Sequence, residues 1–182
     1  MNVIKTDIEG VFVIEPQVFG DERGYFFESF NAERFRAQTG VEVTFVQDNE
    51  SRSKRGVLRG LHFQRAPYEQ AKLVRVVQGR VLDVAVDIRP ESPTFGKYAM
   101  TELSGENHRQ MFIPKGFAHG YVVLEDDTVF QYKCDEYYHP EYEGGVAWND
   151  PQIGIEWGIP ESEIILSDKD RKHLILKELC EF

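Results

Sequence analysis

The sequence contains only two cysteines, Cys134 and Cys180, and no long hydrophobic run in its 182 residues. Two cysteines are too few for a disulfide framework in a chain of this size, which favours a reducing compartment. No stretch of about 18 consecutive apolar residues is present, so a membrane-spanning helix is not expected. The opening residues, MNVIKTDIEG, carry acidic side chains early and lack the apolar segment of a signal peptide. These absences predict a cytoplasmic protein that does not bind membranes.

Basic residues are also in short supply, with 21 Lys and Arg against 31 Asp and Glu and a formal net charge of −10. This balance argues against non-specific binding to nucleic acid. An anionic substrate would therefore have to meet a local group of Arg and Lys side chains. The chain has no internal repeat, low-complexity segment or linker, and its length suits one domain. We expect a single domain over residues 1–182 that is long enough to bury a core.

Most of the chain is predicted to form short β-strands. Runs rich in aromatic and β-branched residues occur at VFVIE (11–15), GYFFESF (24–30) and EVTFVQ (42–47). In VLDVAVDI (81–88) the even-numbered residues are apolar and alternate with Asp, Ala and Asp, which predicts a strand with one apolar face. Turn-forming residues recur between such runs, a spacing that is typical of a β-sandwich or barrel.

Only residues 31–39 show a clear helical pattern. Asn31 can cap the start of this helix, and Gly40 can end it. The polar segment SRSKRG (51–56) is expected to be a loop, and the chain from 135 onward is also rich in loop-forming residues. We therefore expect an all-β protein with a few short helices.

Five histidines are candidates for chemistry: His62, His108, His119, His139 and His173. The first and third lie inside apolar, strand-like runs. The other three lie in polar stretches, where a histidine is ordinarily a surface residue without a catalytic role. A lone histidine in a strand is also more often a core residue than a catalyst, so the surrounding motifs must decide.

The segment GENHRQMFIPKGFAHGYVVL (105–124) resembles the second motif of the cupin superfamily, with Pro114, Gly116 and His119 at its fixed positions. The first cupin motif would carry two histidines separated by one residue. This chain has His62 followed by Phe63 and Gln64 instead. A catalytic metal site needs about three protein ligands. Because Gln64 replaces one ligand, we expect neither a metal nor another cofactor.

A closer resemblance covers about residues 1–172. The runs DERGYFFE, FVQDN, LRGLHFQ, QAKLVRVVQG, PKGFAHGY, YKCDEYYHPEYEGG and LSDKD occur in this order. Together they resemble the dTDP-4-dehydrorhamnose 3,5-epimerases, metal-free, cupin-like enzymes of the dTDP-L-rhamnose pathway. The resemblance implies a jelly-roll fold, a homodimer and a dTDP-linked 4-keto-6-deoxy sugar as substrate.

The resemblance also implies catalytic roles. His62 is expected to be the general base and Tyr132 the general acid on the opposite face of the sugar. Asp170 is expected to orient His62, with Asp168 as the competing candidate, and Lys72 to lie beside the sugar carbonyl.

The expected substrate-binding residues form a larger set. By resemblance Tyr138 stacks on the thymine and Lys72 lies at the sugar. The remaining contacts to the nucleotide sugar are expected from Arg23, Glu28, Gln47, Asn49, Arg59, His119, Glu143 and Lys169.

These residue types suit the chemistry independently of the resemblance. In a 4-keto sugar, the hydrogens on C3 and C5 are acidic because both carbons flank the ketone. Epimerisation needs a base on one face, an acid on the other and a cation near the enolate oxygen. Histidine is well suited as a base near neutral pH, and tyrosine stays protonated there and can donate a proton. Guanidinium groups such as those of Arg23 and Arg59 suit a diphosphate.

The spacing of Arg59 and His62 raises a geometric question. Residues three apart on a regular strand point to opposite faces, yet both are assigned to one site. Gly60 lies between them, and a glycine in a strand often marks a bulge. We therefore expect a bulge or twist at this position.

Three other functions are weighed against the 3,5-epimerase. The first is an epimerase that acts on one carbon or on another nucleotide-linked ketosugar. The second is a non-catalytic, cupin-like binding module, which would not need both His62 and Tyr132. The third is a metal-dependent cupin, which Gln64 disfavours. For the expected homodimer, the strand-like segment Val11–Glu15 is the candidate to pair across a two-fold axis.

Overall fold

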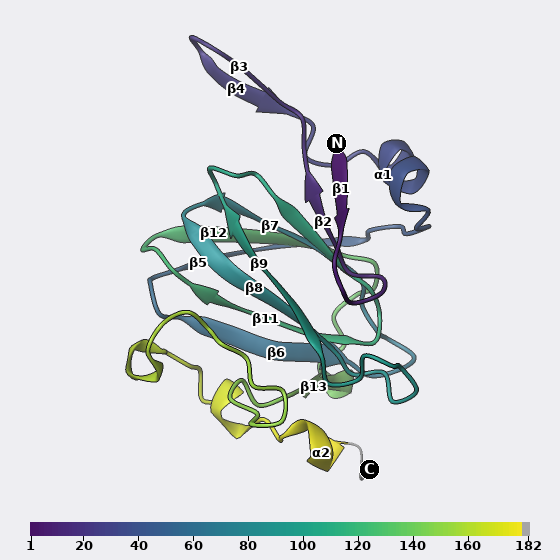
Figure 1. Ribbon diagram of the computed structural model, residues 1–182, viewed down its shortest axis with the longest axis vertical. Coiled ribbons are helices and arrows are strands. Elements are labelled where there is room, and N and C mark those ends of the chain that lie inside the picture. Colours follow the sequence, from purple (N-terminus) through teal and green to yellow (C-terminus); the bar gives the residue numbers. More distant parts are fainter. Residues whose placement is uncertain (180–182) are drawn as a thin grey trace.

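The computed structural model describes residues 1–179, and antiparallel strands form most of its regular secondary structure (Figure 1). The larger sheet has six strands. Their order across the sheet is β1 (Asn2–Lys5), β2 (Phe12–Glu15), β10 (Gln110–Ile113), β7 (Lys72–Gln78), β12 (Thr128–Cys134) and β5 (Gln47–Ser53).

A second sheet of five strands faces the first. Its order is β13 (Glu143–Gly145), β6 (Leu58–Gln64), β11 (Phe117–Val123), β8 (Arg80–Asp87) and β9 (Tyr98–Ser104). Only β8 and β9 are consecutive in sequence among the neighbours in this order, whereas β6 pairs with the distant strands β11 and β13. The two facing sheets form the cupin-like β-sandwich that the sequence predicts.

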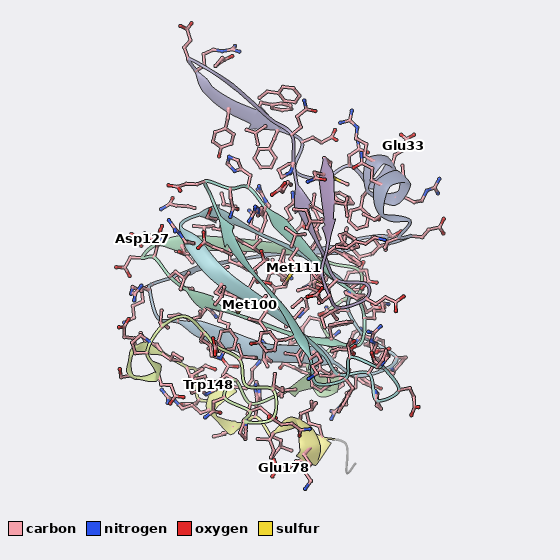
Figure 2. All side chains as sticks on the ribbon, viewed as in Figure 1. Glu33, Met100, Met111, Asp127, Trp148 and Glu178 are labelled. Carbon is pink, nitrogen blue, oxygen red and sulfur yellow. The ribbon has the colours of Figure 1, made fainter. Side chains whose placement is uncertain are left out.

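Apolar side chains from both sheets fill the space between them. Val74, Met111 and Phe130 come from the larger sheet, and Val81 and Leu103 come from the smaller sheet; all are almost completely buried. Figure 2 shows Met111 among the side chains that fill this interior. Burial of this kind is worth about 25 cal/mol per Å² of apolar surface, so this layer is a main source of stability.

Strand β8 has the predicted alternation, but the face that carries its aspartates points into the sandwich. Its even-numbered residues, such as Val84 and Val86, lie on the outer face, where the C-terminal segment covers them. Its odd-numbered residues point into the sandwich, and Asp83 among them is fully buried there. The face that looks polar in the sequence is therefore an interior face.

The outer faces of the two sheets are covered by different segments. Helix α1 (Ala32–Thr39) packs Phe35 against Phe12 and Phe112 of the larger sheet. The C-terminal segment crosses the smaller sheet and contributes Trp157 and Leu176 to a second buried cluster (Figure 1). This segment contains 3₁₀ turns at Glu161–Glu163 and Asp170–Lys172 and helix α2 (Leu176–Leu179); an earlier 3₁₀ turn spans Pro140–Tyr142.

The predicted helix is confirmed, including both of its ends. The side chain of Asn31 accepts a hydrogen bond from the Arg34 backbone N–H, and Gly40 adopts a left-handed conformation with φ of 73°. Its backbone N–H donates to the carbonyl of Arg36, as a C-terminal cap does.

Two local predictions are wrong. Residues 42–47 do not form a strand; β5 begins only at Gln47 and continues to Ser53, so half of the expected loop at 51–56 is strand. Val41, Val43 and Phe45 alternate in burial because they pack near helix α1, but residues 41–46 lack a strand partner. In this segment, the alternation of apolar and polar residues reflects packing near helix α1 and does not indicate a paired strand.

The N-terminal region contains a hairpin of β3 (Val18–Asp21) and β4 (Gly24–Phe27), which projects away from the sandwich (Figure 1). Strand β2 pairs with β1 on one side and with β10 on the other. The expectation that Val11–Glu15 pairs with a second copy is therefore wrong, because both edges of this strand are already used within the chain.

Two further features bear on the sequence predictions. Across residues 1–179, no helix has the length and apolar character needed to cross a membrane. Cys134 is a buried free thiol, whereas Cys180 lies outside the described residues.

Candidate active site

A cavity of about 430 Å³ lies between the two sheets. Strands β5, β7 and β12 of the larger sheet form one wall, and β6, β11 and β13 of the smaller sheet form the other. The structure brings together here most of the predicted site residues: Gln47, Asn49, Arg59, His62, Lys72, His119, Tyr132, Tyr138, Glu143 and Lys169.

An irregularity in β6 explains how Arg59 and His62 reach the same cavity. His62 pairs with His119, and Arg59 pairs with Tyr121, so three steps on β6 match two steps on β11. The extra residue falls at Gly60, which has a φ of 124° and lies against the backbone of Gly120. The predicted bulge is present, and it turns both side chains toward the interior.

His62 is paired with a carboxylate. Its Nε2 atom lies 2.6 Å from Oδ1 of Asp170, whose other oxygen accepts a hydrogen bond of 2.8 Å from Ser167. Burial opposes ionisation of Asp170, but the hydrogen bonds from His62 and Ser167 outweigh it and hold the pKa of this carboxyl below its usual value. Asp168 is exposed, so the structure places Asp170 rather than Asp168 behind the imidazole.

Tyr132 and Lys72 lie on the opposite wall, on the neighbouring strands β12 and β7. Burial, with smaller contributions from neighbours such as Cys134, raises the pKa of Tyr132 to about 12, so its hydroxyl remains protonated and can donate a proton. The ammonium of Lys72 lies 6.0 Å from the centre of the Tyr132 ring and is almost completely buried. Burial lowers the pKa of Lys72, while the charges of Cys134, Asp83 and Glu143 oppose this shift.

His119 belongs to a second histidine–carboxylate pair. Its Nε2 atom lies 3.0 and 3.1 Å from the two oxygens of Asp83 on the adjacent strand β8. Burial lowers the pKa of His119, and the nearby charge of Asp83 opposes this effect. The sequence analysis missed Asp83, although an aspartate in the middle of a predicted strand, with valine and leucine beside it, is the signal that could have singled it out.

Polar contacts join three of the predicted binding residues. Glu143 accepts a hydrogen bond of 2.7 Å from Lys169 and one of 3.0 Å from the hydroxyl of Tyr138. Burial works against ionisation of Glu143, but these two hydrogen bonds keep its pKa below the usual value. The Tyr138 ring is half exposed, so one of its faces is available for stacking on a ligand.

Gln64 has a structural role at the place where a metal-binding cupin has its second histidine. Its side-chain amide donates to the carbonyls of Tyr68 and Tyr137 at 2.6 and 3.1 Å. Its oxygen accepts a hydrogen bond of 2.6 Å from the backbone of His139. The buried side chain therefore ties β6 to the segments on both sides of Tyr138.

Three predicted site residues do not line the cavity: Asp170 lies behind His62, and Arg23 and Glu28 lie away from the cavity altogether. Arg23, in the turn of the β3–β4 hairpin, is strongly exposed and paired with Asp21. Glu28 accepts hydrogen bonds or ion pairs from Asn31 and Arg34 beside helix α1. Neither side chain lines the cavity of its own chain.

The comparison with known families agrees with this geometry. Residues 5–178 match the family model described as dTDP-4-dehydrorhamnose 3,5-epimerase. The chain belongs to the dTDP-4-dehydrorhamnose 3,5-epimerase family. An Escherichia coli protein of that name is 57% identical over 180 residues, which cover 98% of this chain and 96% of that protein.

Solved structures of related proteins have the same fold. A 3,5-epimerase from Legionella pneumophila in complex with dTDP-4-keto-L-rhamnose is 52% identical, with a TM-score of 0.93 over 97% of this chain and 93% of that one. A 3′-monoepimerase from Streptomyces bikiniensis in complex with dTDP-quinovose is 35% identical, with a TM-score of 0.91 over 98% and 89%. Structural relatives of this chain therefore include one protein named as a 3,5-epimerase and one named as a 3′-monoepimerase.

Proposed function

We propose that this chain is a dTDP-4-dehydrorhamnose 3,5-epimerase, which converts dTDP-4-dehydro-6-deoxy-D-glucose to dTDP-4-dehydro-L-rhamnose. The observation that carries the proposal is the placement of His62 with Asp170 on one wall of the cavity and Tyr132 on the facing wall. A base and an acid on opposite sides of a sugar ring are what inversion of a carbon requires.

The reaction begins with removal of a proton from C3 or C5. Since Nε2 of His62 is directed at Asp170, its Nδ1 atom is the one left to accept the proton. The ionised Asp170 then stabilises the imidazolium, and the carboxylate also fixes the tautomer before the reaction. An imidazole positioned in this way is a typical general base.

Removal of the proton produces an enolate with negative charge on the C4 oxygen. Lys72 provides a nearby positive charge for this oxygen, and its ammonium is buried, where electrostatic stabilisation is stronger than in water. Tyr132 then donates its phenolic proton to the opposite face of the carbon. Its elevated pKa keeps the proton in place until the enolate forms. His62 then releases its extra proton to solvent water and Tyr132 takes one up from it, after which the same steps repeat at the second carbon.

Binding of the nucleotide is assigned to the remaining cavity residues. Arg59 is the guanidinium that suits the diphosphate, with Ser53 accepting a hydrogen bond of 3.1 Å that holds it. Tyr138 offers a ring face for the thymine, and Gln47 accepts a hydrogen bond from the Tyr138 backbone at 3.2 Å. Asn49 accepts from Gln47, so both amides are held at the same wall.

The proposal includes a cytoplasmic homodimer in which the β3–β4 hairpin reaches the cavity of a second copy. The hairpin projects from the sandwich and exposes Phe19, Tyr25 and Phe26, which suits an interface (Figure 1). It would deliver Arg23 to the phosphates of the neighbouring site. The exposed aromatic side chains of the hairpin and the position of Arg23 outside its own chain's cavity support a site that is completed by a second copy of the chain.

Mixing two inactive variants tests this arrangement. Arg23→Ala and His62→Ala proteins are refolded together so that mixed dimers form. If Arg23 acts on the partner's site, each mixed dimer has one intact site and activity returns. No recovery, or a monomeric mass by light scattering at micromolar concentration, would contradict the proposal.

The main test counts solvent hydrogen incorporated into the sugar. The chain is incubated with dTDP-4-keto-6-deoxyglucose in deuterated water, and NMR then locates the deuterium. Label and inversion at both C3 and C5 are expected. Label at one carbon only would identify a single-position epimerase, the alternative that the similarity to the 3′-monoepimerase keeps open. No label would indicate a binding module.

A further inference from the structure

We propose that His62, Asp170 and His173 form a binding site for a divalent transition-metal cation such as Zn²⁺, and that the bound cation inhibits the epimerase. The inhibition rests on the proposed function, whereas binding of the cation does not. The site differs from the metal site of cupins, because it uses the C-terminal segment instead of His119 or the position of Gln64.

The first support is geometric. One donor atom from each of the three side chains lies within 4.8 Å of the other two. His62 and Asp170 are already in contact at 2.6 Å, and the imidazoles of His62 and His173 meet edge to face with ring centres 5.4 Å apart. Zinc holds nitrogen and oxygen ligands at about 2.0–2.2 Å, so small side-chain rotations bring all three to one ion.

The second support is an unsatisfied polar atom. Nδ1 of His173 is buried and has no hydrogen-bond partner among the described residues. Leaving such a group unpaired is unfavourable, because it has lost its hydrogen bonds to water without a replacement. Asp170 is hydrogen-bonded to His62 and Ser167, and Nδ1 of His62 is the atom assigned to the substrate's proton. His173 is therefore the member of the cluster whose buried ring nitrogen has no partner within residues 1–179. A cation that recruits the imidazole would give it one.

The backbone holds His173 in this place. The next residue, Leu174, forms a bridge with Val146, directly after strand β13. Gly145 pairs with His62, and a Cβ atom at Gly145 would collide with the His173 ring. The ring is therefore fixed against the strand that neighbours the proposed base, which reduces the entropy lost when a cation binds.

The donor chemistry selects the class of cation. Two imidazoles and one carboxylate form the set of three protein ligands that zinc binds with an open fourth position. Of the other nearby charges, Lys169 is neutralised by Glu143, which leaves Asp170 to attract the cation. Metal binding displaces the proton that His62 shares with Asp170. With the cation bound to both side chains, His62 can no longer take up a proton and be stabilised as an imidazolium by Asp170, so turnover stops.

Inhibition by zinc tests the proposal against matched variants. The wild-type protein should retain full activity in a chelator, lose it as Zn²⁺ is added, and recover when the chelator is restored. His173→Asn and His173→Phe should retain basal activity, since His173 does not line the cavity. Their half-inhibitory zinc concentration should rise at least about tenfold, because even outer-shell partners contribute about 10–100-fold to metal affinity. His139→Asn is the control and should not change it, although His139 also lies near a carboxylate.

Cobalt binding provides a readout that does not depend on activity. The wild-type protein titrated with Co²⁺ should show the visible bands of a low-coordinate site with nitrogen ligands, and His173→Asn should not. A thiolate charge-transfer band would place the metal at a cysteine and overturn the proposal. Absence of both binding and inhibition at millimolar zinc, or equal inhibition of wild type and both His173 variants, would also overturn it. An inactive wild-type protein that still binds Co²⁺ would refute only the epimerase function.

Discussion

Two histidine–carboxylate pairs face the same cavity, yet their surroundings differ. In the pair of His62 and Asp170, the imidazole is 27% exposed and its partner comes from a 3₁₀ turn 108 residues away. In the pair of His119 and Asp83, the imidazole is only 7% exposed and the partner lies on the adjacent strand. The first pair has access to a ligand, whereas the second is enclosed by the sandwich.

The difference shows that a pair of residue types does not define a catalytic role. An exposed imidazole can exchange protons with a substrate and regain its tautomer from the carboxylate. Burial lowers the pKa of the His119 imidazole, so the enclosed position disfavours its charged form. We therefore expect the first pair to serve chemistry and the second to hold the cavity wall beside Lys72.

The largest expected effect is the loss of the exposed pair. His62→Ala should abolish deuterium exchange at both carbons, while binding of dTDP survives because the nucleotide contacts lie elsewhere. Asp170→Asn keeps the shape of the pair but cannot stabilise the imidazolium, so turnover should fall by about 10²–10⁴-fold. Exchange is followed by NMR and dTDP binding by calorimetry. Full activity of Asp170→Asn would refute the role of this carboxylate.

Removal of the acid on the facing wall should separate exchange from inversion. Tyr132→Phe changes one hydroxyl and little volume, so the nucleotide should bind normally. The variant should still exchange deuterium at one or both carbons, because His62 can remove and return a proton on its own face. Most of the doubly inverted product should disappear when NMR reads label position and ring configuration together. Wild-type yields of the L-sugar would assign the acid to water or another residue.

Disruption of the enclosed pair of His119 and Asp83 should mainly reduce stability. Turnover should fall much less than it does in Asp170→Asn. Asp83→Asn weakens the contact with His119 and leaves buried polar groups imperfectly paired. The free energy of unfolding should fall by about 1–3 kcal/mol. Urea denaturation measures this change, with Asp170→Asn as the matched control. The comparison fails if Asp83→Asn reduces turnover as much as Asp170→Asn without affecting stability.

A smaller effect is expected at Gln64, which supports the site without facing the substrate's reacting carbons. Gln64→Leu removes three hydrogen bonds that hold the segments around Tyr138. KM for the nucleotide sugar should rise severalfold while kcat changes little. Gln70→Leu is the matched control, since it loses one hydrogen bond to the same loop, at Glu136. A drop in kcat with unchanged KM would contradict this role.

The smallest expected effect is the pH dependence of stability. Because burial lowers the pKa of His119 in the folded protein, the unfolded chain binds a proton there first as the pH falls below about 6.5. Stability is therefore lost on the acid side of that value. For Asp170, whose folded pKa is also lowered, the loss begins only below the ordinary value of about 3.9. His119→Gln should flatten the dependence between about pH 7 and about pH 5 in urea denaturation; an unchanged slope would contradict this.

Local patterns predicted much of the fold because they follow from short-range physics. The cap at Asn31, the end at Gly40 and the alternation in residues 81–88 are all confirmed. The segment 42–47 shows the limit, since alternating burial there comes from packing near helix α1 without a strand partner. A strand needs a neighbour with free backbone groups, and the sequence does not name that neighbour.

The sequence by itself determined the residue types of the site, the family resemblance and the bulge expected at Gly60. Only the tertiary structure decided that Asp170 rather than Asp168 contacts His62, because this depends on how the C-terminal segment crosses the sheet. It also revealed Asp83 and His173, and it placed Arg23 and Glu28 outside the cavity of their own chain. These are long-range facts, set by which strands pair and which segments cover them.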